Sequence, residues 1–168
     1  MSLLSRSLPV FTSLAISLVA APSHAGSSRT ITSGLGCVQA YGQAEAKTSY
    51  GDDGGFYNDA PDWYRTAVCP LPHTTSLYLN STATVDVFDR SYDFDASCRL
   101  VMRSATWTTW GAAAVTSGSN AAAQRLTMTH AAGEHLIANV HLLCYLPPVY
   151  QGNRSGLIGF DAAVKSLF

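Results

Sequence analysis

An acidic, glycine-rich stretch at residues 51–62, GDDGGFYNDAPD, holds the residues best suited to binding a metal ion. Its oxygen ligands would come from Asp52, Asp53, Asn58 and Asp59. A hard cation such as calcium takes roughly six to eight oxygens, and glycines let a chain wrap closely around it. The spacing does not match an EF-hand, and Gly, Asp, Asn and Pro also favour solvated turns. We therefore carry two interpretations, a calcium site and a turn-rich loop that binds no metal.

A second group of aspartates lies at residues 85–95, VDVFDRSYDFD. Here Asp89 stands two residues before Ser91, a spacing at which an Asp side chain accepts a hydrogen bond from the backbone. We interpret this group as structural, with a second cation site as the alternative.

Aromatic side chains next to polar loops are the second set of residues with binding chemistry. They include Tyr57, Trp63, Trp107 and Trp110. Exposed aromatic faces stack on sugars and anchor protein interfaces, whereas buried ones fill the core of a sandwich. In an extended strand Trp107 and Trp110 have opposite parity, so at most one of them faces the core. These four residues are the predicted ligand-binding set.

Residue types that serve in catalysis are present without a recognised arrangement. The chain has no G-x-S-x-G turn for a serine nucleophile. The histidines, among them His130, His135 and His141, lack the spacing of a zinc site. Paired glutamates are also absent, since Glu45 and Glu134 are the only two. The sequence predicts a non-catalytic protein without a cofactor apart from the calcium considered above, and a hydrolase with an unrecognised site is the remaining alternative.

The first 25 residues have the composition of a secretory signal peptide. Arg6 precedes an apolar run at residues 10–21, and Ser-His-Ala at residues 23–25 supplies small residues for cleavage. The apolar run is shorter than the roughly 20 residues that span a bilayer. We expect cleavage near Ala25 and a mature protein that is extracellular or periplasmic and not inserted in a membrane. Residues 26–36 are small and polar, which predicts a flexible segment.

Four cysteines follow in what would be an oxidising compartment, where an even number indicates disulfides. Cys98 and Cys144 lie in the middle of two expected strands, in phase with apolar neighbours, which favours a bridge on the core side. Cys37 and Cys69 then form the other pair and would fasten a weak strand near the mature N-terminus. A cysteine metal site is disfavoured because no C-x-x-C pair is present.

Period-two alternation and turn residues divide residues 37–168 into about eight short strands. Many short strands with regular turns favour an all-β sandwich or barrel, and we expect one jelly-roll-like β-sandwich of antiparallel strands. A helix is considered only at residues 112–130, where Thr, Ser and Gly weaken it. The expected strands are at residues 37–49, 64–71, 83–89, 96–103, 106–116, 124–129, 136–146 and 156–165, with residues 51–62 as a loop.

A series of short motifs resembles a set of uncharacterised secreted bacterial β-sandwich proteins. The motifs are CPLP at 69–72, VDVFDRS at 85–91, CRL at 98–100 and CYLPP at 144–148. The resemblance covers most of the predicted mature chain. It implies a two-disulfide sandwich with the pairing favoured above, and it carries over no catalytic or ligand-binding residue.

Net charge and composition limit the classes of partner that this chain is expected to bind. The formal net charge is −1 and charged residues make up 12% of the chain, which argues against a nucleic-acid surface. We expect a secreted binding or adhesion module, in particular one that binds glycans through loop aromatics. The alternative is a structural subunit of an extracellular assembly, a homo-oligomer joined through strand edges, in which residues 26–36 pair with a neighbour's edge.

Overall fold

The computed structural model describes residues 27–40, 47–71, 79–133 and 135–165. The predicted signal peptide at residues 1–25 therefore lies outside the described residues and stays a prediction. Within the described ranges the chain forms twelve strands and one 3-10 turn, η1 (Gly34–Gly36). None of those ranges contains a helix that is long and apolar enough to cross a membrane. The strands are β1 (Ser27–Ser33), β2 (Val38–Gln39), β3 (Thr48–Tyr50), β4 (Phe56–Asn58), β5 (Arg65–Leu71), β6 (Asn80–Phe88), β7 (Ser97–Arg103), β8 (Thr108–Trp110), β9 (Ala114–Val115), β10 (Gln124–Ala131), β11 (Asn139–Leu146) and β12 (Gly156–Lys165).

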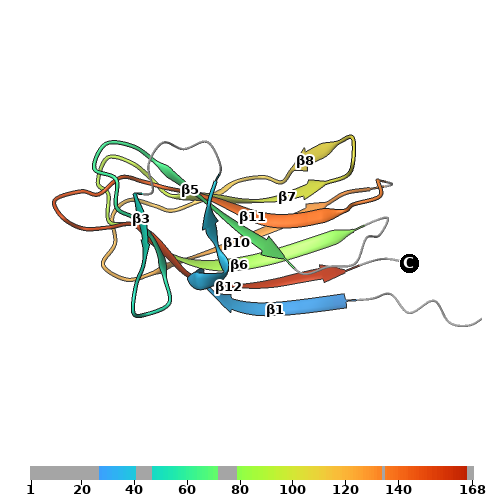
Figure 1. The fold of residues 1–168 in the computed structure, drawn as a ribbon, viewed down its shortest axis with the longest axis horizontal. Helices are drawn as coiled ribbons and strands as arrows, with labels where there is room; N and C mark the ends of the chain where they lie inside the picture. Colours follow the sequence, from blue (N-terminus) through green and yellow to red (C-terminus); the bar gives the residue numbers. More distant parts are fainter. Residues whose placement is uncertain (1–26, 41–46, 72–78, 134, 166–168) are drawn as a thin grey trace, which may run out of the picture.

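The strands form two antiparallel six-stranded sheets that pack face to face (Figure 1). The β12 sheet has the order β10-β6-β12-β4-β3, and β1 also pairs with β12. The β11 sheet has the order β2-β5-β11-β7-β8, and β9 also pairs with β7. From β4 to β7, and again from β10 to β12, successive strands alternate between the sheets. The expected all-β, jelly-roll-like sandwich is confirmed. The described ranges form twelve strands where about eight were expected, and residues 106–116 form two short strands, β8 and β9, in place of one.

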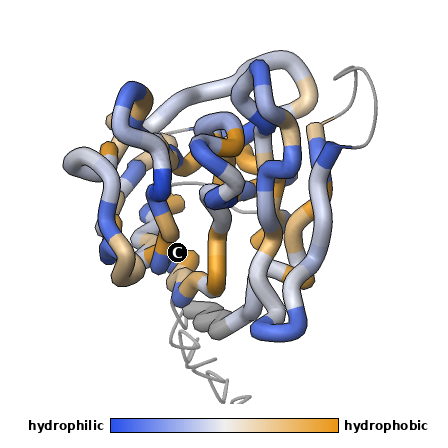
Figure 2. Tube along the Cα trace, turned by 90° about the vertical axis from the view of Figure 1, so that its left-hand side faces the viewer, coloured by the Kyte–Doolittle hydropathy of each residue, from blue (hydrophilic) through white to orange (hydrophobic). Residues whose placement is uncertain are grey.

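The core lies between the sheets and follows the period-two pattern of the sequence. In β6 the side chains of Val85 and Val87 are fully buried, while Thr84 and Asp86 face outward. Complete burial of one such aliphatic side chain stabilises the fold by about 1.5–3 kcal/mol. Figure 2 shows the hydrophobic segments along strands and hydrophilic ones over many of the loops. The largest fully buried apolar side chains are Phe56, Leu79, Leu100, Met102, Ile137, Leu142, Leu146 and Leu157.

Two disulfides join Cys37 to Cys69 and Cys98 to Cys144, the pairing that the sequence favoured. Cys98 and Cys144 lie directly opposite each other on β7 and β11. In both bridges the Cα atoms are 4.1 Å apart, and all four cysteines are buried. The second bridge therefore links two strands of the β11 sheet, and the first links Cys37, which directly precedes β2, to β5 of the same sheet, so neither links the two sheets.

Residues 27–36 differ from the flexible segment expected at 26–36. Ser27–Ser33 forms β1 and pairs residue by residue with β12, from Lys165 to Gly159. The reason is that β4 covers only Gly156 and Leu157 of β12, which leaves the rest of that edge open to a strand. The Thr-Ile-Thr sequence at residues 30–32 has the residue types that favour strands, and this signal was missed. The segment thus belongs to the sheet of its own chain.

Residues 37–49 do not form the single strand that was expected. Val38–Gln39 joins the β11 sheet and Thr48–Tyr50 joins the β12 sheet, while residues 41–46 lie outside the described part. The stretch at 51–62 likewise contains β4, all of whose residues are buried. Phe56 supplies a core side chain there after a tight turn at residues 51–55, in which Gly54 donates its N–H to the carbonyl of Gly51. The glycine and aspartate content of residues 51–62 predicted a loop, so the three-residue strand β4 was not expected.

Candidate functional site

Three loops meet at one end of the sandwich and present exposed aromatic side chains. They are the loops at residues 59–64, 89–96 and 147–155, which join β4 to β5, β6 to β7 and β11 to β12. Figure 2 looks onto this end of the molecule. Trp63 is 68% exposed, Tyr92 is 75% exposed and Phe94 is 48% exposed. We call the set formed by Trp63, Tyr64, Tyr92, Phe94 and Tyr150 the aromatic ridge.

Contacts between rings connect the three loops. Tyr64 packs edge-on against Phe94, with ring centroids 5.7 Å apart and ring planes at 74°. On the other side, Tyr92 packs against Tyr150 with centroids 5.5 Å apart. Aromatic pairs of this geometry contribute about 0.5–1.5 kcal/mol beyond the area they bury. The middle loop thus contacts both of its neighbours, and the ring faces turned away from these contacts remain open to solvent.

Asn58 fixes two of these loops from below. Its side chain is fully buried, and its amide nitrogen lies 3.0 Å from the Trp63 carbonyl oxygen and 2.9 Å from those of Leu146 and Pro147. Its amide oxygen accepts the backbone N–H of Ala60 at 2.8 Å. A buried amide with both ends satisfied makes a rigid junction. The backbone of Trp63 is therefore held in place, although its ring is exposed.

Asp89 holds the middle loop, at residues 89–96, through hydrogen bonds of its own. This fully buried carboxylate accepts the backbone N–H of Ser91 at 3.1 Å and that of Ala96 at 2.9 Å. It also accepts a hydrogen bond from the hydroxyl of Thr116. The turn expected between Asp89 and Ser91 is confirmed. Because both ends of the loop are bound to one carboxylate, Tyr92 and Phe94 project from a closed turn.

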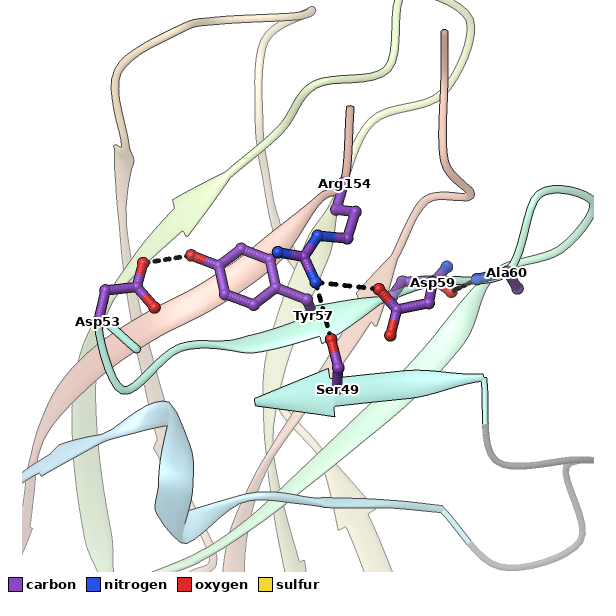
Figure 3. A network of polar contacts seen from close by, with 7 residues as sticks. Ser49, Asp53, Tyr57, Asp59, Ala60 and Arg154 are labelled. Carbon is purple, nitrogen blue, oxygen red and sulfur yellow. Dashed lines mark hydrogen bonds and ion pairs between the residues drawn. The ribbon is translucent and has the colours of Figure 1, made fainter. Parts of the chain in front are cut away.

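A polar network fastens the third loop to β3 and β4 (Figure 3). The Arg154 guanidinium lies over the ring of Tyr57, 4.7 Å from its centroid, and donates to Ser49 Oγ at 2.9 Å and to Asp59 Oδ1 at 3.2 Å. The hydroxyl of Tyr57 donates to the carboxylate of Asp53. Burial, followed by this hydrogen bond, raises the pKa of Tyr57 to about 12. Conversely, the hydrogen bond from Tyr57 lowers the pKa of Asp53.

These contacts disagree with a calcium site at Asp52, Asp53, Asn58 and Asp59. Three of the four have separate partners, since Asp53 binds Tyr57, Asp59 binds Arg154 and Asn58 binds backbone groups of the interior. Nor do three acidic, His or Cys side chains converge on one point anywhere in the part of the chain that the structure describes. The hypothesis treated these four side chains as neighbours in one loop. In the structure Asn58 belongs to β4, a strand in which successive side chains point to opposite faces of the sheet.

The four predicted aromatic residues lie in four different surroundings. Trp63 belongs to the aromatic ridge, but Tyr57 is buried beneath Arg154. At the other end of β7, Trp107 is partly buried and stacks on His135 with centroids 3.9 Å apart. Trp110 is 52% exposed on β8, in the β11 sheet, near the guanidinium of Arg99. They therefore do not form one site.

Sequence reasoning missed Tyr92, Phe94 and Tyr150 as members of the ridge. For Tyr92 and Phe94 the signal is the alternation of aromatic and acidic residues in SYDFD at residues 91–95, shortly after a clear strand. The structural interpretation of the aspartates at residues 85–95 explains Asp89 but not these exposed aromatic residues.

No protein-family model and no curated protein matches this chain. Among solved structures it is similar to the xylan-binding module CBM15, with 12% identity over 83% of this chain and 98% of that one and a TM-score of 0.48. It is also similar to the CBM36-1 domain of a multidomain xylanase from the hindgut metagenome of Trinervitermes trinervoides, with 10% identity, 81% and 96% coverage and a TM-score of 0.41. A third similar structure is Eiger TNF from S. frugiperda, with 14% identity, 84% and 92% coverage and a TM-score of 0.38. Such likenesses carry no function to this chain, whose role has to be inferred from its own geometry.

Proposed function

We propose that this protein is a secreted, non-catalytic glycan-binding module and that the aromatic ridge is its binding surface. The observation that carries the proposal is the exposure of Trp63, Tyr92 and Phe94 on loops whose backbones are held by buried polar groups. Exposed aromatic side chains at the end of a stable domain mark a surface for binding.

The physical case for a sugar rests on the shape and composition of the ridge. Aromatic faces can cover the apolar C–H face of a pyranose ring, while hydroxyl groups at their edges bind its polar rim. Tyr64, Tyr92 and Tyr150 contribute three such hydroxyls to the ridge, and the ring of Tyr64 packs against that of Phe94. Because the loops are already fixed, little conformational entropy is lost when a ligand binds. A preorganised, aromatic surface whose loops also carry the exposed carboxylates Asp62, Asp93 and Asp95 favours a saccharide over a nucleic acid.

A second function, the subunit of an extracellular assembly, is favoured by one feature of the sheets. Within the described residues, β1 pairs with β12 alone, so its outer edge offers backbone groups to another strand. The earlier form of this hypothesis, in which residues 26–36 cross to a neighbour, has to change because Ser27–Ser33 pairs within its own chain. Size-exclusion chromatography across a range of concentrations tests self-association separately from glycan binding.

Screening the secreted protein on a glycan array, followed by isothermal titration calorimetry with the best oligosaccharide, tests the proposal. We expect Trp63→Ala and Tyr92→Ala each to weaken binding by about tenfold or more, since each removes an exposed stacking face. Trp110→Ala is the matched control, because Trp110 is exposed on the β11 sheet outside the ridge. Binding that is lost in the control but kept in the ridge variants would contradict the proposal, as would an array without a single bound glycan.

A further inference from the structure

The outer face of the β12 sheet carries an open hollow of about 480 Å³, separate from the ridge. It extends across β10, β6, β12 and β1, strands that lie side by side in Figure 1. Its volume is within the range of small-molecule sites, roughly 300–1,000 Å³. The lining residues are Thr32, Thr84, Asp86, Arg125, Thr127, Gly159, Phe160 and Asp161.

Strand register places the outward side chains of this hollow in two rows. Asp86 lies directly opposite Arg125 on one side and Gly159 on the other. In the next row Thr84 lies between Thr127 and Asp161. Directly opposite residues of antiparallel strands share a face of the sheet, so these side chains border one surface.

Gly159 lines the hollow without a side chain. It follows an irregularity in the pairing of β12 with β6, between Leu157 and Gly159, and contributes no side chain opposite Asp86. A Cβ atom there would lie 3.2 Å from the carbonyl oxygen of Thr32, so the neighbouring strand is already close. The missing side chain leaves space between Asp86 and β1.

The polar groups around this space are held in fixed positions. The guanidinium of Arg125 binds the Asp86 carboxylate through two hydrogen bonds, Nε to Oδ1 at 2.8 Å and Nη2 to Oδ2 at 3.0 Å. In the next row the hydroxyl oxygens of Thr84 and Thr127 are 3.4 Å apart. All four of these side chains are partly or fully exposed. An exposed ion pair such as Asp86–Arg125 contributes little to stability. The planar donors and acceptors of this ion pair can still bind the adjacent hydroxyls of a ligand.

Charge then narrows the class of ligand. The guanidinium in the lining, Arg125, is already bound by the carboxylate of Asp86. A phosphate or uronate ligand would have to displace that carboxylate, whereas an uncharged ligand would not. Phe160, the one aromatic residue of the lining, is turned toward the core and is 4% exposed, so an apolar ligand gains little. From this geometry we infer that the hollow is a second binding site, for an uncharged, hydroxyl-rich saccharide.

This inference goes beyond the proposed function, since the hollow and the ridge share no residue. Two sites on one domain would let a polysaccharide chain bind at two points, which raises the overall affinity without new contacts. Either site can exist without the other, so each can be tested alone.

Nuclear magnetic resonance titration of the ¹⁵N-labelled protein with cellohexaose, xylohexaose and mannohexaose, each up to about 10 mM, tests the inference. Oligogalacturonate is the anionic comparison. We expect at least one neutral oligosaccharide to shift the amide signals of Thr84, Asp86 and Gly159 saturably, and oligogalacturonate to leave them unchanged. The titration is repeated with Trp63→Ala combined with Tyr92→Ala, where the same shifts should persist although ridge binding is lost.

The double variant Thr84→Val, Thr127→Val removes two hydroxyls from the hollow and keeps β-branched side chains. We expect it to weaken the binding seen at the hollow by about tenfold or more. The control is Thr82→Val, Thr129→Val, a directly opposite pair on the same two strands that does not line the hollow. Equal affinity of the two double variants overturns the inference. So does a titration in which none of the three neutral oligosaccharides shifts those amides, or in which oligogalacturonate shifts them most.

Discussion

The hydroxyl of Thr116 donates a hydrogen bond to the buried carboxylate of Asp89, 27 residues earlier in the chain. The same carboxylate accepts the N–H groups of Ser91 and Ala96. Ala96 leads into β7 and Thr116 follows β9, so one side chain joins the middle loop of the ridge to the β11 sheet. The exposed rings of Tyr92 and Phe94 depend on this interior contact for their position.

Replacing Asp89 should therefore destabilise the whole domain. Asp89→Ala leaves the buried N–H of Ser91 without its acceptor, while Ala96 and Thr116 keep only the hydrogen bonds between them. We expect a loss of about 1–3 kcal/mol in the free energy of unfolding. Urea denaturation followed by circular dichroism measures it. The exposed Asp93 on the same loop provides the control, Asp93→Ala. Equal stabilities of the two variants would show that Asp89 has no such role.

Asn58 should couple stability to ligand binding. Asn58→Asp removes the amide donor to the carbonyl oxygens of Trp63, Leu146 and Pro147 and buries a charge in its place. We expect a destabilisation of about 3 kcal/mol and weaker binding to the best glycan at temperatures where the variant remains folded. Unfolding curves and calorimetric titrations on the same samples check both. A variant with unchanged binding would mean that the ridge does not need this junction.

Removing β1 should lower the melting temperature. A chain that begins at Gly34 lacks the pairing between Ser27–Ser33 and β12, whereas a chain that begins at Ser27 retains it. We expect the shorter chain to melt at least about 5 °C lower, because an edge of β12 becomes unpaired and exposed. Differential scanning calorimetry compares the two. A difference of less than about 1 °C would restore the view of residues 26–36 as a flexible segment.

High pH should destabilise the folded protein through the ionisation of Tyr57. Its pKa is raised to about 12 in the folded protein, above the ordinary value of 10.0. The neutral phenol is thus favoured by folding, and its contribution to stability is complete below pH 10 and is lost as the pH rises toward 12. Burial also raises the pKa of Tyr64. A spectrophotometric titration of phenolate absorbance should therefore show a late ionisation, and Tyr57→Phe should reduce its amplitude by one tyrosine. An identical titration curve for the variant would rule out this environment.

Alternation in the sequence was sufficient to predict the long strands. β6, β7 and β11 each carry apolar residues at every second position, and β12 does so from Phe160 to Val164, because one face of each packs in the core. The same phase placed Cys98 and Cys144 on the core side. β4 and β1 are different, since both pair with the open edge of β12 and neither alternates apolar and polar residues along its length. The Thr-Ile-Thr sequence of β1 favours a strand, but the local sequence does not reveal a partner that lies more than 90 residues away.

The candidate site was predictable only in part for the same reason. Trp63 stood out as a tryptophan in a polar loop, and it is exposed. Tyr92 and Tyr150 come from loops that the jelly roll brings together at one end, a proximity set by strand order. The calcium hypothesis grouped four side chains by their spacing along the chain, which does not reveal that Asn58 turns inward while Asp53 turns to Tyr57.

Trp63 can report directly on whether the aromatic ridge binds glycan. The chain has three tryptophans, so Trp107→Phe combined with Trp110→Phe leaves Trp63 as the single indole. Titration of this variant with the best oligosaccharide from the array should shift the Trp63 emission to shorter wavelength, because a stacked sugar removes water from its exposed face. The account predicts a saturable shift with the same Kd that calorimetry gives for the unmodified protein. Calorimetric binding without any change in Trp63 emission would contradict it.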